Sequence, residues 1–150
     1  MDADDLVPAL EKVDLFQGLS PKIVRRIAAS GRAEAFGPGE TVIEQGEAVS
    51  GWHAFSPKGV EFHVILAGSA EVTVGDQVKR TLEEGAYFGE LSLIDGKPRS
   101  AEVAAGQQGL TTFAMSKWQF EVLLEDHPAV AISMLRVLAG RLRAAEQARS

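Results

Sequence analysis

Residues Phe88 to Ala101 read FGELSLIDGKPRSA, a stretch with the side chains needed to bind a small phosphorylated ligand. Gly89 lets the backbone approach a ligand closely. Glu90 opens a short apolar run that can form one helical turn, and the first N–H groups of such a turn have no intrahelical partner. Because those N–H groups suit an anion, we predict that a phosphate binds there.

The same stretch ends with two hydrogen-bond donors. Arg99 follows Glu90 by nine residues, behind a Gly-Lys-Pro turn, and Ser100 adds a hydroxyl. The planar guanidinium of arginine can bond two phosphate oxygens at once, whereas the carboxylate of Glu90 suits a sugar hydroxyl. A lone Glu or Arg is usually a solvated surface charge. The ordered combination, however, favours a site for a sugar phosphate.

This stretch resembles the phosphate-binding cassette of cyclic-nucleotide-binding domains, whose pattern is Phe-Gly-Glu, an apolar run, then Pro-Arg and a small residue. The resemblance extends over residues 36–139 or so. It implies that Glu90 accepts a hydrogen bond from the ribose 2′-hydroxyl and that Arg99 and Ser100 bind the cyclic phosphate. Mainly backbone contributions are implied for Gly89, Leu91 and Ala101.

The base of such a ligand needs apolar cover. Strand residues Val72, Val74 and Leu82 are candidates, although an ordinary strand core gives the same pattern. In the resembled family the final helix often covers the base, which here implies Leu138, Arg141 or Leu142. We expect cAMP as the ligand, with cGMP as the alternative, because bacterial regulators with a similar segment pair the arginine with serine and bind the adenine nucleotide.

Composition indicates one folded domain spanning residues 1–150. Hydrophobic residues make up 45% of the 150-residue chain, too many for disorder, and a core of that size needs no disulfide. The absence of cysteine excludes thiol chemistry. Acidic residues near the N-terminus and the lack of a long apolar run lead us to expect a cytoplasmic protein without a membrane segment. A net charge of −6 disfavours binding to nucleic acid.

Three regions position the cassette. Residues 1–32 are predicted to form helices, one of them with Ser20 as N-cap, Pro21 at the first helical position and Gly31 at its end. Short apolar or alternating runs between glycine turns, over residues 33–115, predict a mainly β fold with an antiparallel β-roll or jelly-roll-like barrel. Those strands are expected at residues 41–43, 62–67, 71–74 and 102–104.

Residues 116–147 are predicted to form two C-terminal helices. Ser116 and Gln119 make a capping box for the first, and Pro128 starts the second. A stripe of apolar residues recurs along the second helix at three- and four-residue intervals. It has three possible partners: the barrel, its twin in a dimer, or a bound base. The stripe consists of Pro128, Ala131, Leu135, Leu138, Leu142 and Ala145.

The loop over residues 48–59 is longer than expected for this type of roll. Trp52 and Phe55 within it are predicted to fold back as an apolar plug or, if exposed, to form a contact site. The sequence leaves the role of this loop open.

Catalytic motifs are missing. His53, His63 and His127 each occur alone, so we predict no metal site, and His63 in a strand-like run is expected to be packed. The glycines near Gly85 do not form a Walker loop, because the Gly-Lys-Ser/Thr ending of that loop is absent. We therefore expect no enzyme activity and no cofactor.

The sequence favours a stand-alone cyclic-nucleotide sensor that switches a partner contact, in a homodimer or an effector protein, through its C-terminal helix. The alternative is a β-roll that binds no nucleotide and serves as an interaction module, forming a homodimer or a regulatory subunit of a larger enzyme. DNA binding is not expected, because the few residues after Leu142 are too short for a recognition helix and its scaffold.

Overall fold

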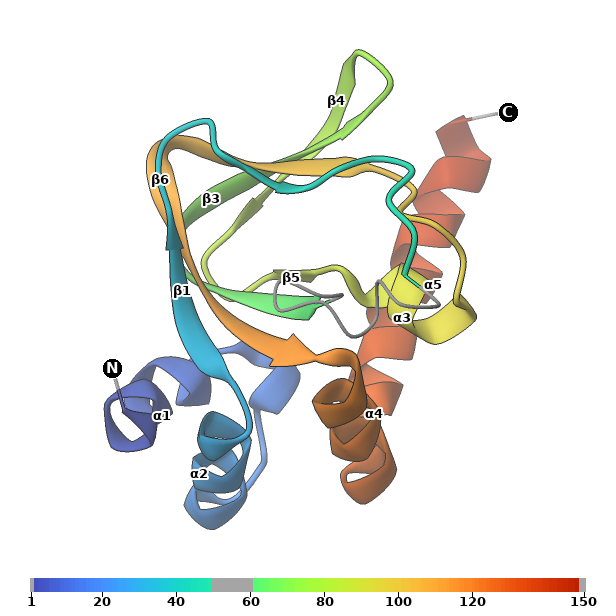
Figure 1. Ribbon diagram of the computed structural model, residues 1–150. Coiled ribbons are helices and arrows are strands. Elements are labelled where there is room, and N and C mark those ends of the chain that lie inside the picture. The colour runs from blue at the N-terminus through green and yellow to red at the C-terminus, as the bar shows by residue number, and fades with distance from the viewer. Residues whose placement is uncertain (1, 50–60, 149–150) are drawn as a thin grey trace.

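The computed structural model describes residues 2–49 and 61–148, and the predicted plug of Trp52 and Phe55 lies outside these ranges. A β-roll is flanked by helices at its base and along one side (Figure 1). The elements in chain order are α1 (Ala3–Glu11), η1 (Asp14–Phe16), α2 (Pro21–Ala29), β1 (Arg32–Phe36), β2 (Thr41–Ile43), β3 (Glu61–Val74), β4 (Gln77–Glu83), β5 (Tyr87–Phe88), α3 (Glu90–Asp95), β6 (Glu102–Ser116), α4 (Lys117–Asp126) and α5 (Pro128–Ala148). The predicted fold class, an antiparallel roll with helices on either side in sequence, is confirmed.

The strands form one antiparallel sheet in the order β1-β6-β3-β4, with β2 also paired to β6 and β5 to β3. Two of the predicted strands, residues 62–67 and 71–74, are parts of the single strand β3. The reason lies at Gly68, where φ is +81° and the pairing register shifts on either side. A Cβ at Gly68 would clash with the carbonyl oxygen of Gly109 on β6. The two glycines therefore bend long paired strands where the sequence suggested a turn.

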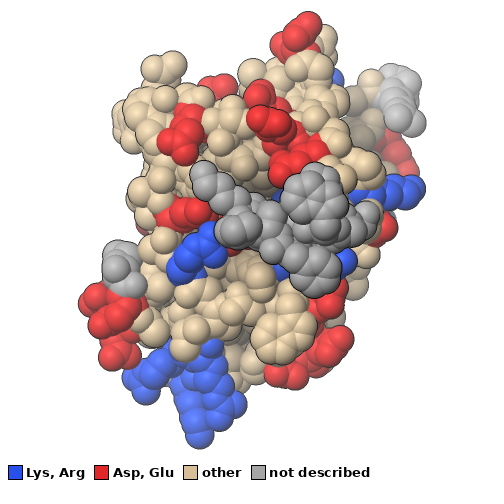
Figure 2. All heavy atoms as spheres, in the orientation of Figure 1, with Lys and Arg blue, Asp and Glu red and all other residues tan. Residues whose placement is uncertain are grey.

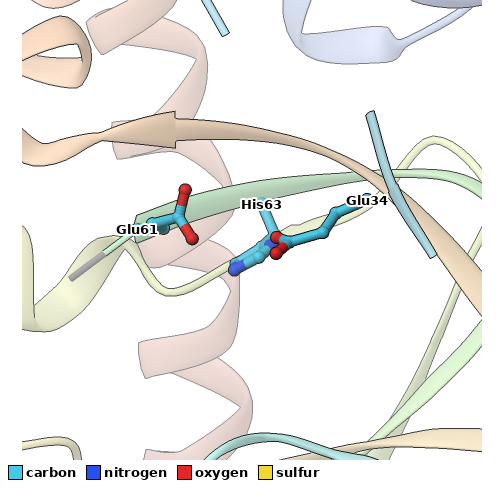
Figure 3. A group of neighbouring side chains, drawn as sticks. All are labelled: Glu34, Glu61 and His63. Carbon is cyan, nitrogen blue, oxygen red and sulfur yellow. The ribbon is translucent and has the colours of Figure 1, made fainter. Parts of the chain in front are cut away.

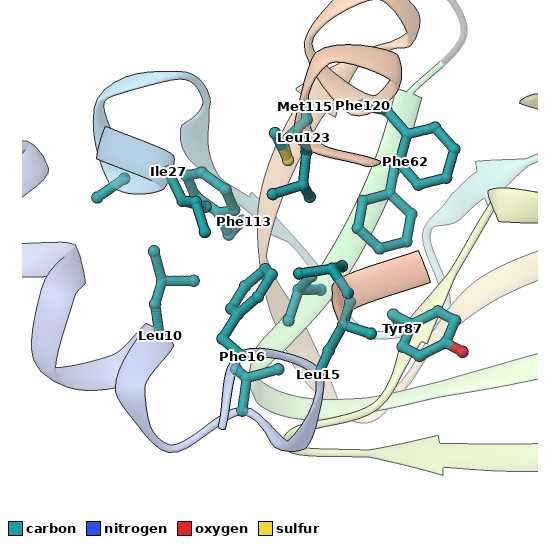
Figure 4. Packing of buried hydrophobic residues seen from close by; sticks show 14 of the residues in the cluster. Leu10, Leu15, Phe16, Ile27, Phe62, Tyr87, Phe113, Met115, Phe120 and Leu123 are labelled. Atoms are coloured by element: carbon teal, nitrogen blue, oxygen red, sulfur yellow. The ribbon is translucent and has the colours of Figure 1, made fainter. Parts of the chain in front are cut away.

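Buried apolar residues form two clusters. One fills the base of the roll between the sheet and the helices, and its aromatic centre is Phe62, which packs against Phe120 with ring centroids 4.8 Å apart (Figure 4). The second lies inside the roll and includes Ile65, Val72 and Leu82. This second cluster borders the ligand cassette, so the core and the candidate site share residues.

The predicted helix starts are confirmed. The Ser20 hydroxyl accepts from the Ile23 amide, and Ser116 and Gln119 form the capping box. Helix α2 ends at Ala29, before the predicted Gly31. Gly31 is instead required for packing, because a Cβ there would clash with the carbonyl oxygen of Ala114. It permits the close approach of the chain to β6.

The fully buried residues of helix α5 are not members of the predicted stripe, of which Ala131 and Leu138 are half-buried. Those buried residues are Val130 and Met134, whereas Leu135 is 64% exposed and Leu142 is 60% exposed. Of the three partners that the sequence left open for the stripe, the barrel is therefore not the partner of these two leucines. A three- and four-residue spacing marks an apolar face, but the surface that meets it depends on how the helix is docked.

Charge is unevenly distributed on the face shown in Figure 2. Acidic side chains are scattered over both its upper and lower parts, and a group of basic side chains lies at its lower end, where Figure 1 places α2. Among the described residues, none of the helices combines the length and apolarity required to span a bilayer.

Candidate functional site

A cavity of about 50 Å³ lies inside the roll, between the sheet, α3 and the distal part of α5. Both of the buried charged residues of the cassette, Glu90 and Arg99, line it. The cassette thus contributes two charged residues to the wall of the cavity, Glu90 at the start of α3 and Arg99 in the segment leading to β6. The full lining is Ile43, Val72, Arg80, Leu82, Tyr87, Phe88, Gly89, Glu90, Leu91, Ser92, Arg99, Ser100, Ala101, Val103 and Arg141.

Glu90 is a buried carboxylate with spare hydrogen-bonding capacity. It is 3% exposed, and its Oε2 atom is buried without a hydrogen-bond partner among the described residues. Burial raises the pKa of Glu90 above its usual value, while its own backbone amide and the arginines Arg141, Arg80 and Arg99 oppose this rise. A buried acceptor that receives no hydrogen bond costs free energy, so this oxygen favours a hydroxyl or N–H donor from a ligand.

Arg99 is held by backbone on both sides of its guanidinium. Its Nη1 donates to the Gly89 carbonyl at 2.8 Å, and its Nη2 donates to the Glu61 carbonyl at 3.1 Å. Its own amide donates to the Glu47 carbonyl, so the main chain is also fixed. Burial lowers the pKa of Arg99, and the carboxylates of Glu47, Glu90 and Glu61 counteract that effect. The result is a guanidinium that two backbone carbonyls orient and that lines the cavity.

Arg141 reaches the site from α5. Its Nη1 atom lies 3.6 Å from Oε2 of Glu90, and its Cζ atom lies 5.9 Å from the ring centroid of Tyr87. The ion pair is one-sided in exposure, since the Arg141 side chain is 25% exposed and that of Glu90 only 4%. Arg141 therefore connects the C-terminal helix directly to the predicted ribose-binding carboxylate.

The structure brings together most of the residues that the sequence singled out. The lining includes all six of the predicted cassette residues, as well as Val72, Leu82 and Arg141 from the predicted base-contacting set. Three other members of that set are not in the lining: Val74, which is 38% exposed near the end of β3, and Leu138 and Leu142 on α5. Leu142 is exposed on α5, whereas Leu138 lies three residues before Arg141 on the same side of the helix and is half-buried outside the lining.

Sequence reasoning missed several lining residues. Arg80 on β4 and Val103 on β6 enter the cavity through the pairing of both strands with β3, which places residues far apart in sequence side by side. Tyr87 lies just ahead of the cassette, and its buried hydroxyl has no partner among the described residues. Burial raises the pKa of Tyr87 to about 12, with Glu90 adding to the effect. In the sequence, only the position of Tyr87 between the Gly85 turn and Gly89 could have indicated that it lines the cavity.

Beside Arg99 the structure also gathers three side chains that the sequence treated separately. Glu34 of β1 and Glu61 and His63 of β3 have potential ligand atoms within 4.8 Å of one another (Figure 3). Both oxygens of Glu61 are bonded to Arg32, at 2.6 and 2.9 Å, and Glu34 accepts from the same guanidinium at 3.3 Å. Arg32 therefore already compensates part of the negative charge of the two carboxylates.

His63 is packed, as the sequence predicted. It is 4% exposed, its ring stacks on Phe88 with centroids 4.9 Å apart, and Nδ1 lies 2.9 Å from the Thr112 hydroxyl. Burial lowers the pKa of His63 to about 3, and the positive charges of Arg99 and Arg32 contribute. The folded protein therefore favours the neutral imidazole.

Because the pKa of His63 is lowered on folding, its contribution to stability is complete above the unfolded value of about 6.5 and is lost as the pH falls toward 3. We expect this loss to approach about 1.4 kcal/mol per pH unit well below 6.5. Denaturant unfolding of the wild type and His63→Gln between about pH 7.5 and 5 would measure it. Carboxylates titrate in both proteins, so the difference between the two curves isolates His63. Parallel curves would contradict the assignment.

Comparison with known proteins gives a consistent picture. The model of the cyclic nucleotide-binding domain family matches residues 33–127, more than half of the chain. A cAMP-dependent protein kinase regulatory subunit from Mycosarcoma maydis is 39% identical over 100 residues, which cover 64% of this chain and 17% of that protein. A cyclic nucleotide-gated potassium channel from Mesorhizobium japonicum is 30% identical over 119 residues, covering 79% and 30%. The chain thus spans less than a third of either relative.

Solved structures agree in fold. The structure of cAMP-bound PfPKA-R (141–441) matches with a TM-score of 0.79 at 24% identity, covering 98% of this chain and 48% of that one. The catabolite activator protein of Thermus thermophilus matches with a TM-score of 0.73 at 26% identity, covering 89% and 60%. Together with the buried glutamate and arginine of the cassette, the family match shows that the chain belongs to the cyclic nucleotide-binding domain family.

Proposed function

We propose that the chain binds a cyclic nucleotide, with cAMP preferred over cGMP, and that it acts as a regulatory sensor. One observation carries the proposal: a buried carboxylate with an oxygen that accepts no hydrogen bond among the described residues, Glu90, and a buried oriented guanidinium, Arg99, line the same cavity. In this assignment Glu90 accepts from the ribose 2′-hydroxyl, and Arg99 with Ser100 binds the cyclic phosphate. Relatives include proteins named for cAMP and for cGMP dependence, which leaves the base to be tested.

The charges of the site suit a cyclic monophosphate. Such a phosphate carries one negative charge, and one arginine with a neighbouring hydroxyl is a proportionate receptor for it. Arg99 uses Nη1 and Nη2 for two carbonyls and keeps further N–H donors for the ligand. Apolar cover for the base is available from Val72, Leu82 and Val103. We infer that the role of the chain is regulatory and not catalytic. We also infer that it acts in the cytoplasm and needs no cofactor besides the nucleotide.

Binding requires the site to open. A cavity of about 50 Å³ has room for one or two waters, whereas pockets for small organic ligands measure about 300–1,000 Å³. Arg141 is the side chain best placed to move, because it contacts Glu90 and belongs to the second half of α5. The ribose hydroxyl and Arg141 compete for the same carboxylate oxygen. We therefore propose that ligand binding releases Arg141 and shifts α5, which changes a partner contact.

Calorimetric titration with cAMP, cGMP and linear 5′-AMP tests the proposed function. We expect a dissociation constant in the micromolar range or below for cAMP, corresponding to about −8 kcal/mol, weaker binding of cGMP and no detectable binding of AMP. Linear AMP serves as the control because it keeps the base and ribose but carries a different phosphate geometry and charge. No heat with either cyclic nucleotide, together with no thermal shift, would refute the proposal.

Arg141→Ala should tighten cAMP binding by about tenfold, because the ligand would no longer compete with the guanidinium for Glu90. Arg143→Ala is the matched control, since Arg143 is exposed on the same helix and is absent from the lining. Hydrogen exchange of α5 in the wild type should accelerate when cAMP binds and should already be fast in Arg141→Ala. Weaker binding by Arg141→Ala would instead show that this arginine contacts the bound nucleotide.

The exposed apolar residues of α5 favour a partner for this helix. Ile132, Leu135 and Leu142 are 47, 64 and 60% exposed. As the second candidate, we propose that this helix forms a homodimer or docks on an effector protein, as in a regulatory subunit. Light scattering with and without cAMP, on the wild type and on Leu135→Gln, tests the homodimer. A monomer under all conditions leaves the effector as the remaining partner.

A further inference from the structure

The guanidinium of Arg99 depends on a carbonyl that lies outside the cassette. Of the two carbonyls that hold it, the one from Gly89 belongs to the cassette, whereas the other belongs to Glu61, the first residue of β3, 38 positions earlier in the chain. The orientation of Arg99 is therefore set partly by the position of the β3 start. Whatever fixes Glu61 also fixes Arg99.

Glu61 is fixed by its own side chain. Its carboxylate receives both arms of the Arg32 guanidinium, with Nη1 2.6 Å from Oε2 and Nη2 2.9 Å from Oε1. The two residues come from β1 and β3, which lie on opposite sides of β6, where Arg32 pairs with Ala114 and Glu61 pairs with Ser116. The ion pair thus bridges two strands across the one between them and restrains the β3 start (Figure 3 shows Glu61 at that end of the strand).

The exposure of the pair suits a positioning role. The Glu61 side chain is 11% exposed, so its carboxylate needs a partner, whereas the Arg32 side chain is 51% exposed and is readily solvated without one. Burial raises the pKa of Glu61, and the hydrogen bond from Arg32 opposes that rise. Neither side chain lines the cavity between α3 and the sheet. Any effect of the pair on a ligand there must act through another residue.

We propose that Arg32 and Glu61 are positioning residues for the phosphate-binding arginine. Their bidentate pair places the Glu61 carbonyl where Nη2 of Arg99 can use it, so that the guanidinium faces the cavity with its remaining donors. This inference rests on the proposed function for its effect on nucleotide binding. The orientation of Arg99 itself is a property of the nucleotide-free protein and is testable without any ligand.

Glu61→Gln tests the proposal with little change in shape. We expect about tenfold weaker cAMP binding, because the amide cannot accept both arms of Arg32 and the carbonyl position loosens. Glu34→Gln is the matched control. Glu34 also accepts from Arg32, at 3.3 Å, but the carbonyls to which Arg99 donates belong to Gly89 and Glu61. Its affinity should stay within about twofold of the wild type.

A double-mutant cycle separates positioning from a general structural effect. In an Arg99→Lys background the fork that Glu61 orients is gone, so Glu61→Gln should cause little further loss of cAMP affinity. Arg32→Gln should reproduce the effect of Glu61→Gln, and the two together should add little. Equal losses of affinity from Glu61→Gln in both backgrounds, or an unchanged affinity in the single variant, would overturn the proposal.

A readout without nucleotide separates this inference from the proposed function. In the free wild type, nitrogen NMR of the Arg99 guanidinium should report slow rotation about the Nε–Cζ bond, since both Nη atoms are hydrogen-bonded. Glu61→Gln should accelerate this rotation, whereas Glu34→Gln should not. If the wild type binds no cyclic nucleotide yet the rotation changes as expected, the proposed function fails and the positioning stands. If Glu61→Gln leaves the rotation unchanged, the proposal that Arg32 and Glu61 position Arg99 is wrong, and the proposed function is unaffected.

Discussion

Replacing Arg99 with alanine should reduce the affinity for cAMP by about a thousandfold or more. A hydrogen bond to a charged group contributes about 1.5–3 kcal/mol, and the guanidinium is expected to supply two or more to the cyclic phosphate. Two such bonds correspond to about three powers of ten in the dissociation constant. With wild-type binding in the micromolar range, calorimetry of Arg99→Ala should detect no binding.

The same substitution should also destabilise the fold. From the sequence alone, an arginine without a ligand is expected to be a solvated surface residue, and Arg99→Ala would then leave the fold unaffected. In the structure Arg99 is 7% exposed and donates to the carbonyls of Gly89 and Glu61, so alanine leaves both acceptors without this donor. We expect a cost of about 1–3 kcal/mol in the free energy of unfolding.

Two further variants give this experiment its controls. Arg99→Lys keeps the charge but loses the fork, so it should bind cAMP with intermediate affinity. Lys97→Ala removes an exposed positive charge two residues away and should change the affinity by less than about twofold. If Arg99→Ala retains wild-type affinity while folded, Arg99 is not the phosphate ligand. If Lys97→Ala weakens binding as strongly, long-range charge is responsible for the loss.

The sequence predicts the parts of the site that lie close together in the chain. Glu90 and Arg99 are only nine residues apart, and the glycine, apolar turn and proline between them limit how the segment can fold. Helix starts were predictable for the same reason, because Ser20 and Ser116 act on amides within three residues. Local hydrogen-bonding chemistry can be inferred from local sequence.

The remaining features depend on how distant segments are docked. Arg80 reaches the cavity only because β4 pairs with β3 in one register, where Arg80 lies opposite Val72. The carbonyl of Glu61 that holds Arg99 carries no side-chain signal in the sequence at all. Likewise, the apolar stripe on α5 left three partners open, and the structure assigns the buried face to Val130 and Met134. Register and docking arise from the packing of the whole roll.

Gly89→Ala should cause the second largest effect, on both stability and binding. Gly89 caps α3 with a φ of +91°, a conformation that costs an alanine about 1–2 kcal/mol. In addition, its Cβ would lie 2.8 Å from the carbonyl oxygen of Glu61. That oxygen belongs to the backbone of a paired strand and accepts from Arg99, so it cannot move without disturbing the guanidinium. We expect a loss of about 2–4 kcal/mol in unfolding free energy.

Gly96→Ala separates the two causes, because it caps the other end of the same helix. Its φ is +73°, so alanine meets a similar backbone cost, but a Cβ at this position would meet no heavy atom within 4 Å beyond its chain neighbours. We expect Gly96→Ala to lose only the backbone cost and to bind cAMP within about twofold of the wild type. Gly89→Ala should bind about a hundredfold more weakly, since the Gly89 carbonyl that accepts from Nη1 moves as well. Similar affinities for the two variants would mean that the contact between Gly89, Glu61 and Arg99 does not govern phosphate binding, whatever the two variants do to stability.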